Sequence, residues 1–225
     1  MTYLSIVMEG KSLYKSCLKR VIDIVLSLCI IGLLWPVFLV AAVLIKAEDR
    51  GSVIFGQIRI GKNCRVFKMY KFRSMAVGSE HSGSGVYSGN NDDRVTKVGR
   101  FLRATSIDEL PQAVNILKGD MSFIGPRPPI TYHPWPIGEY SEEELRMFEL
   151  RPGITGWAQV HGRKNVEWHE RIRLNIWYVD HCSFLLDLKI FLMTILQVFS
   201  NKDNVNTFET ARKSGADNLS DKAKG

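Results

Sequence analysis

An uncharged apolar run between residues 24 and 45 constrains this chain more than any other part of its sequence. At a rise of about 1.5 Å per residue, roughly 22 helical residues just span a bilayer core of about 30 Å. The run is longer than the apolar region of a signal peptide, and no small-residue cleavage site closes it. It therefore predicts a helix that stays in the membrane.

Two details of this run leave its topology open between a single span and a re-entrant helix. Pro36 lies inside it, where a proline removes a helical hydrogen bond and kinks the helix. A spanning helix usually carries its lysine and arginine excess on the cytoplasmic side only. Here cations lie on both flanks: Lys15, Lys19 and Arg20 before the run, Lys46 and Arg50 after it. They fit a helix broken at Pro36 that enters and leaves by the cytoplasmic face, with Ser27 or another protein segment as the candidate partner for the freed backbone groups.

The remaining chain predicts an α+β fold that is mostly helical. Residues 52–75 have the alternation of a β-hairpin that turns at residues 61–63, and a Gly- and Ser-rich surface loop follows at 76–93. Helical patterns are present at residues 94–104, 139–149, 166–181 and 184–199. The segment at 139–149 is predicted to be an amphipathic, interfacial helix with an acidic face. The segment at 184–199 is predicted to be a buried or interfacial helix, so that both lie around an active site on the cytoplasmic face.

Composition narrows the classes of function. A formal net charge of +7 favours anionic partners: nucleic acid, phosphorylated ligands or anionic lipid. The four cysteines show no CxxC pair, which argues against a zinc site or a disulfide framework. The sequence also has no HExxH metal motif and no GxxxxGK[ST] nucleotide loop.

Two adjacent carboxylates, Asp108 and Glu109, precede a short apolar helix pattern that ends at Gly119. One interpretation is structural: Ser106 and Glu109 have the spacing of a capping box. Pro111 favours Asp108 as the N-cap instead, because a proline fits the first turn of a helix but not its interior. The other interpretation is chemical, since basic residues on both sides would keep the acids ionised and attract anions.

Cations in particular backbone settings are candidate phosphate ligands. Arg127 lies in a proline-rich segment, residues 125–129, whose stiff backbone can aim a guanidinium. Lys71 and Arg73 end the second predicted strand beside the loop, where a ligand contact is more plausible than on a solvated strand face. For Lys68 the solvated face is the preferred interpretation.

Several motifs resemble the bacterial sugar transferase family, whose monotopic phosphoglycosyl transferases initiate glycoconjugate assembly. The motifs lie at residues 71–75, 108–112, 117–122, 125–128 and 151–156. The chain is similar to the minimal members of that family, and the likeness runs through roughly residues 15–195. Trp35 precedes Pro36 where minimal members often have a serine. The sequence therefore leaves open which hydroxyl, if any, supports the helix break.

The resemblance implies a two-step exchange. Asp108 attacks the β-phosphorus of a UDP-sugar and releases UMP, and undecaprenyl phosphate then takes the phospho-sugar. Mg²⁺ is expected at Asp108 and Glu109, with Glu109 binding the ion or assisting proton transfer. The cations expected to bind substrate phosphate are Arg103, Arg127, Lys71, Arg73 and Arg163, with Arg151 a weaker candidate. The implied location is the cytoplasmic face of a bacterial inner membrane, with membrane lipid as a partner and no nucleic acid.

The expected organisation has four parts: a basic segment at 1–20, the membrane helix at 21–46, the catalytic domain at 47–200 and a polar tail at 201–225. A homodimer through Trp177 and residues 184–199 is an alternative to a monomer. Two functional alternatives stay open beside the two-step enzyme. One is a membrane-anchored basic module that binds lipid or nucleic acid without catalysis, and the other is a one-step transferase that binds both substrates together.

Overall fold

A computed structural model describes residues 13–79, 92–162 and 167–200. The described chain is mostly helical, with a small amount of sheet and one long apolar N-terminal helix, α2, at Lys19–Asp49. The later α-helices are α3 (Lys97–Ala104), α4 (Gln112–Lys118), α5 (Glu142–Leu145), α6 (Trp157–Gly162), α7 (Trp168–His181) and α8 (Phe184–Ser200). The predicted tail at 201–225, Arg163 and residues 1–12 of the basic segment lie outside the described residues.

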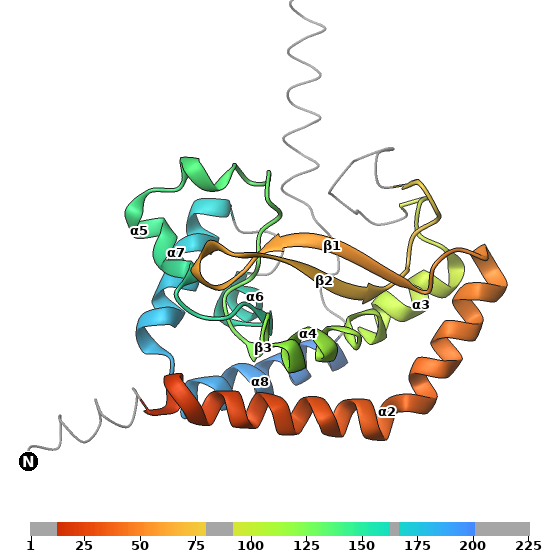
Figure 1. The fold of residues 1–225 in the computed structure, drawn as a ribbon, viewed down its shortest axis with the longest axis horizontal. Helices are drawn as coiled ribbons and strands as arrows, with labels where there is room; N and C mark the ends of the chain where they lie inside the picture. The colour runs from red at the N-terminus through yellow and green to blue at the C-terminus, as the bar shows by residue number, and fades with distance from the viewer. Residues whose placement is uncertain (1–12, 80–91, 163–166, 201–225) are drawn as a thin grey trace, which may run out of the picture.

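The membrane-length helix α2 is longer than predicted and changes direction. It follows a π-helical turn at Tyr14–Leu18 and continues through Pro36 as one assigned helix. Figure 1 shows α2 running along the base of the molecule and then turning upward. The hydroxyl of Ser27 is buried and has no hydrogen-bond partner in the described part of the chain. Ser27 therefore does not support the backbone at Pro36, contrary to the prediction.

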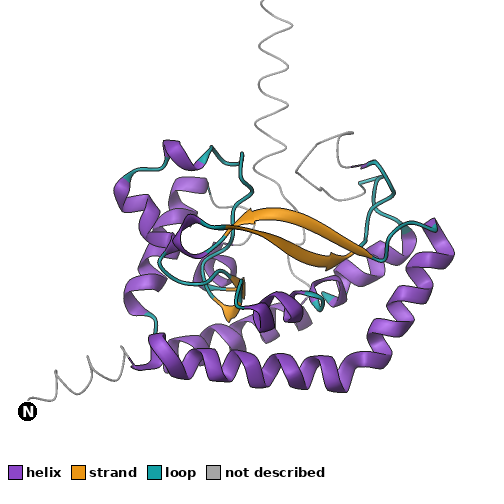
Figure 2. Ribbon diagram, viewed as in Figure 1, coloured by secondary structure: helices purple, strands orange, loops and turns teal. Residues whose placement is uncertain are grey.

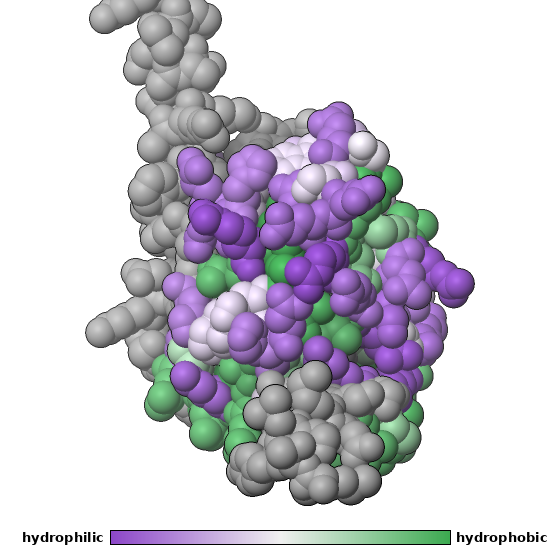
Figure 3. All heavy atoms as spheres, turned by 90° about the vertical axis from the view of Figure 1, so that its left-hand side faces the viewer, coloured by the Kyte–Doolittle hydropathy of each residue, from purple (hydrophilic) through white to green (hydrophobic). Residues whose placement is uncertain are grey.

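The base of the molecule presents an apolar surface. Along α2, large apolar side chains such as Leu33, Trp35 and Val43 are exposed, and α8 exposes Leu185 and Leu196 among others. Among the described residues α2 alone is long and apolar enough to cross a membrane, and only 11% of its most apolar stretch is buried. Figure 3 shows hydrophilic residues over much of one end of the molecule, with hydrophobic residues reaching its lower edge. Because such an apolar surface is unfavourable in water, it indicates membrane association.

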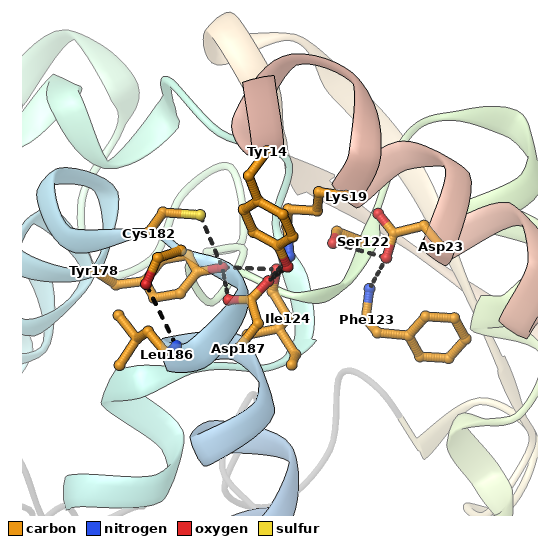
Figure 4. Close-up of polar contacts among 11 residues, drawn as sticks. Tyr14, Lys19, Asp23, Ser122, Phe123, Ile124, Tyr178, Cys182, Leu186 and Asp187 are labelled. Carbon is orange, nitrogen blue, oxygen red and sulfur yellow. Dashed lines mark hydrogen bonds and ion pairs between the residues drawn. The ribbon is translucent and has the colours of Figure 1, made fainter. Parts of the chain in front are cut away.

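A buried polar cluster ties the start of α2 to the C-terminal helices (Figure 4). Lys19 forms an ion pair with Asp187 of α8, and both side chains are nearly enclosed. The Tyr14 hydroxyl donates to Asp187 at 2.6 Å, and the Tyr178 hydroxyl from α7 donates to it at 2.7 Å. One turn further along α2, Asp23 accepts hydrogen bonds from strand β3 (Ser122–Ile124). The N-terminal segment is thus part of the folded core rather than a separate anchor.

The predicted β-hairpin is confirmed. Strands β1 (Ile54–Ile60) and β2 (Val66–Phe72) pair antiparallel, with Ile54 opposite Phe72, and the turn includes residues 61–63 as expected. Figure 2 shows this hairpin as a long ribbon among helices. Asn115 of α4 joins the hairpin to the centre of the molecule, because its carboxamide accepts from Tyr70 N–H at 2.9 Å and donates to the Lys68 carbonyl at 2.8 Å.

The prediction of one amphipathic helix at residues 139–149 is wrong. The segment contains the four-residue helix α5, which Ser141 and Glu144 start with a capping box, and 3₁₀ turns lie at Ile137–Glu139 and Arg146–Phe148. Its apolar side chains Met147 and Phe148 are buried in the protein core. In Figure 1, α5 also lies on the side of the molecule away from α2 and α8. These residues therefore pack inward and are not an interfacial helix. The helices predicted at 166–181 and 184–199 are confirmed as α7 and α8.

Candidate active site

The carboxylate pair lies in a 3₁₀ turn at Ile107–Glu109, between α3 and α4. Ser106 enters this turn in the left-handed region, at φ 57°, and its side chain makes no capping bond. Helix α4 begins at Gln112, with Pro111 at the N-cap position. Both capping predictions are therefore wrong: neither Ser106 nor Asp108 caps α4. Asp108 is placed by a tight turn that a left-handed serine opens.

The two ends of α2 hold the helices on either side of this turn. Near its C-terminal end, the Glu48 carboxylate accepts from the backbone N–H groups of Lys97 and Val98, at 2.8 and 3.0 Å. These are free donors of the first turn of α3, so the carboxylate caps that helix. At the other end of α2, Arg20 donates to the carbonyls of Ile116 and Leu117, which end α4. Helices α3 and α4 are thus both attached to the apolar base.

Asp108 is a buried carboxylate in a cationic setting, with 8% of its surface exposed. The pKa of Asp108 is raised to about 6. Burial is the main cause, Lys71 and Arg103 oppose the rise, and the neighbouring Glu109 adds to it. The side chain is therefore largely ionised at neutral pH but carries less water than an exposed carboxylate. A partly desolvated carboxylate beside cations is suited to react with an electrophile that brings negative charge.

Glu109 has the opposite balance. Burial raises the pKa of Glu109, but the Lys71 ammonium, whose Nζ lies 2.8 Å from Glu109 Oε1, outweighs it together with Arg127 and Arg59, so the pKa is lowered. The two adjacent acids thus have pKa values shifted in opposite directions. Such a difference is typical of acid pairs that divide two roles between them.

The predicted phosphate ligands divide into three groups. Lys71 and Arg103 lie beside the acids, since both lower the pKa of Asp108; Arg103 Nε also donates to Ser74 Oγ at 2.8 Å. Arg127 is exposed, and its backbone N–H donates to Asn175 Oδ1 at 3.3 Å. Arg73 packs against the backbone of Gly51, and its buried Nη1 has no hydrogen-bond partner within the described ranges. Arg163 falls outside the described residues.

Two motifs far apart in the sequence meet next to Arg127. Strand β3 pairs parallel with β4 (Gly153–Thr155), and Gly125 N–H donates to the Thr155 carbonyl at 2.9 Å. Gly153 N–H donates to the Pro126 carbonyl at 3.0 Å. A Cβ atom on Gly153 would lie 2.1 Å from Gly125 N, so this close approach requires glycine. The contact fixes the backbone that leads into Arg127.

Sequence reasoning did not single out Arg59. It lies on β1, and its charge reaches Glu109 and Arg127 through space. The Gln57–Arg59 spacing put both side chains on one strand face, but this pattern is equally typical of a solvated edge. The segment that contains Arg127 is distant in sequence, so no local pattern connects it with Arg59.

The carboxylate pair fits Mg²⁺ by its donor set. Mg²⁺ commonly takes one or two carboxylates and completes its shell with water and substrate phosphate oxygens. Asp108 and Glu109 can supply the carboxylates. Across the described ranges, no group of three or more His, Cys, Asp and Glu side chains could hold a metal ion. The fit therefore depends on a phosphate-bearing substrate for the remaining ligands.

Comparison with known proteins connects this geometry with a family. Residues 14–201 match the family described as bacterial sugar transferase. An uncharacterised sugar transferase of Bacillus subtilis, EpsL, is 38% identical over 80% of this chain and 87% of its own length. A UDP-glucose:undecaprenyl-phosphate glucose-1-phosphate transferase of Klebsiella pneumoniae is 40% identical, over 82% of this chain but 40% of its own length. A UDP-N-acetylgalactosamine-undecaprenyl-phosphate N-acetylgalactosaminephosphotransferase of Aeromonas hydrophila is 42% identical, over 81% of this chain and 44% of its own length.

Proposed function

Because the chain belongs to the bacterial sugar transferase family, we propose that it transfers a sugar 1-phosphate from a UDP-sugar to undecaprenyl phosphate. The products are UMP and undecaprenyl-diphospho-sugar, the first membrane-bound intermediate of a bacterial glycoconjugate. The observation that carries the proposal is the buried Asp108 beside Glu109, Lys71 and Arg103, on helices attached to an apolar base.

In the first step, a carboxylate oxygen of Asp108 attacks the β-phosphorus of the UDP-sugar. The bond from that phosphorus to the bridging oxygen breaks, and UMP leaves with the oxygen and its electron pair. Asp108 then carries the sugar phosphate as an acyl phosphate, which is reactive enough to pass the group on. Lys71 and Arg103 offset the negative charge on the phosphate oxygens during attack.

In the second step, a phosphate oxygen of undecaprenyl phosphate attacks the same phosphorus. The bond between Asp108 and phosphorus breaks, the new diphosphate forms, and the carboxylate is restored. Glu109, held by Lys71 at 2.8 Å, lies in the adjacent position for binding the metal or assisting proton transfer. When bound at Asp108 and Glu109, Mg²⁺ would supply further charge compensation for the diphosphate.

The membrane geometry supports this chemistry. We infer that α2 is re-entrant, with its bend at Pro36, so that both its ends and the catalytic domain at residues 47–200 lie on the cytoplasmic face of the inner membrane. A proline inside a helix is a common cause of a sharp kink. The acceptor carries its phosphate at the headgroup level. Glu48 and Arg20 attach the active-site helices to the two ends of α2, which a re-entrant helix would hold near that level.

Release of UMP by purified protein in detergent micelles tests the enzyme hypothesis. A panel of UDP-sugars with undecaprenyl phosphate should include at least one donor that gives turnover. Asp108→Asn should abolish turnover, because an amide is not a nucleophile towards phosphorus, while Lys68→Asn at an exposed strand position should retain it. A binding module without catalysis would give no UMP with any donor, and turnover by Asp108→Asn would contradict the assigned nucleophile.

A further inference from the structure

Arg59 is a fixed guanidinium next to the candidate site. Its Nε and Nη2 donate to Gln57 Oε1 at 3.0 and 2.6 Å, and its Nη1 donates to the Pro128 carbonyl at 2.8 Å. A guanidinium has five N–H donors, so these bonds leave one donor on each Nη atom. The side chain is therefore held in one orientation while two N–H donors stay available to another group.

The charge of Arg59 is not balanced by a carboxylate. Both of its hydrogen-bond partners are neutral oxygens, and among the described residues it forms no ion pair. The pKa of Arg59 is lowered to about 9, mainly by burial and then by the nearby Arg127, while Tyr132 and Glu109 oppose the shift. Buried cations in proteins are normally paired with an anion. Arg59, whose hydrogen-bond partners are neutral, and the exposed Arg127 near it therefore indicate a place for an anionic ligand.

The backbone places Arg59 and Arg127 on the Glu109 side of the carboxylate pair. The Pro128 carbonyl that binds Arg59 belongs to the residue after Arg127, and Ile60 N–H donates to the Pro129 carbonyl at 3.0 Å. Burial raises the pKa of Glu109, and Lys71 lowers it most. Arg127 and Arg59 lower it further. Lys71 acts on both acids, since its Nζ lies 2.8 Å from Glu109 Oε1 and it lowers the pKa of Asp108 as well, and Arg103 also lowers the pKa of Asp108. Arg59 and Arg127 are thus a further pair of cations, near Glu109.

We propose that Arg59 and Arg127 form a second anion subsite that binds a substrate phosphate other than the one attacked by Asp108. This inference rests on the proposed function. A transfer between two phosphate-bearing substrates must hold one phosphate at the nucleophile and a further phosphate beside it. The further phosphate belongs either to the UMP part of the donor or to the lipid acceptor. Both are oxyanions that a rigid, forked guanidinium binds with two donors.

Direct binding measurements on intact protein in detergent micelles test this subsite. In the donor arm, titration calorimetry measures UMP affinity, which requires no turnover. In the acceptor arm, the same titration uses a short-chain polyprenyl phosphate. Arg59→Gln should weaken one of the two ligands about ten- to a hundredfold, since it removes a charge-assisted contact. The ligand that weakens identifies the source of the phosphate, and unchanged affinity for both would overturn the proposal.

Two further variants separate binding from a purely structural role of Arg59. Arg59→Lys retains the charge but loses the fork, so it should lose less affinity than Arg59→Gln does. Gln57→Leu removes the side-chain oxygen that accepts from Arg59 but keeps the guanidinium. The affinity of this variant for UMP or the polyprenyl phosphate should therefore fall less than threefold. If Arg59 only braced the backbone, all three variants would bind equally weakly, which would overturn the proposal. These two variants also decide the matter if Arg59→Gln does not fold.

Two features make the binding test specific: a charge-matched control variant, and a ligand whose binding does not depend on the Asp108 reaction. Lys68→Gln removes one exposed positive charge from the paired strand and should leave both affinities unchanged. Binding of UMP does not depend on a covalent intermediate. A loss of UMP binding in Arg59→Gln would therefore stand even if the Asp108 nucleophile were disproved, and unchanged binding of both ligands would overturn the subsite even if Asp108 were confirmed.

Discussion

The ion pair between Lys19 and Asp187 provides a strong test of how the N-terminal helix is attached. The exposed fractions of the two side chains are 11% and 7%, and Tyr14 and Tyr178 also donate to Asp187. Asp187→Leu leaves a buried ammonium and two hydroxyl groups without their acceptor. Breaking a buried pair from one side typically costs about 3–5 kcal/mol. For a chain of this size, each kcal/mol lowers Tm by roughly 2–4 °C, so we expect a fall of about 6–20 °C.

Near-UV circular dichroism melts in detergent micelles measure this change, and two comparisons make the test specific. Lys19→Met combined with Asp187→Leu removes both charges and should be more stable than Asp187→Leu alone. Asp180→Leu breaks an exposed ion pair with Arg146, which should contribute less than about 1 kcal/mol. The reasoning is refuted if Asp187→Leu is no more damaging than Asp180→Leu, or if the double variant melts below the single one.

Three more predictions follow from the site and its supports. Glu48→Ala should lower stability by about 1–2 kcal/mol and reduce kcat, because the N–H groups of Lys97 and Val98 in the first turn of α3 lose their acceptor; unchanged melting and turnover would contradict that. The pKa of Asp108 is raised to about 6 and attack requires its ionised form, so kcat/KM should fall as pH drops below about 6. Lys71→Met should move this acid limb of the pH profile to higher pH, because Lys71 lowers the pKa of Asp108. A flat pH profile would argue against Asp108 as the nucleophile. Pro36→Ala should straighten α2 and move an N-terminal tag to the periplasmic face in impermeant-reagent labelling, whereas a tag that is periplasmic in the unaltered protein would refute the re-entrant helix.

Local patterns predicted those elements whose structure depends on neighbouring residues. The hairpin was predictable because alternation and the turn residues at 61–63 act over a few positions. Gly119, at φ 91°, ends α4 as a glycine C-cap should. The turn that carries Asp108 was not predictable in this way. The sequence favours several caps, and no local pattern in it predicts the left-handed conformation of Ser106.

Contacts between distant segments explain the rest of what sequence reasoning missed. The acidic residues at 142–144 suggested a longer helix, but burial of Met147 and Phe148 in the core divides the segment into short turns. Glu48 caps a helix that begins 49 residues later, and Arg59 binds a carbonyl 69 residues away. The periodicity of hydrophobic residues does not predict contacts between residues so far apart in the sequence. The candidate acids and most of their cations were found from their local sequence setting and from motifs that resemble the family's, whereas Arg59 required the folded chain.

The most direct test of the central claim is the mass of the protein after incubation with its UDP-sugar and without acceptor. After rapid acid quenching and proteolysis, the peptide that contains Asp108 should carry one phospho-sugar, and an equal amount of UMP should be released. Added undecaprenyl phosphate should remove the adduct and yield the lipid-linked product. Full turnover with no adduct under these trapping conditions, or an adduct on a peptide without Asp108, would contradict the account.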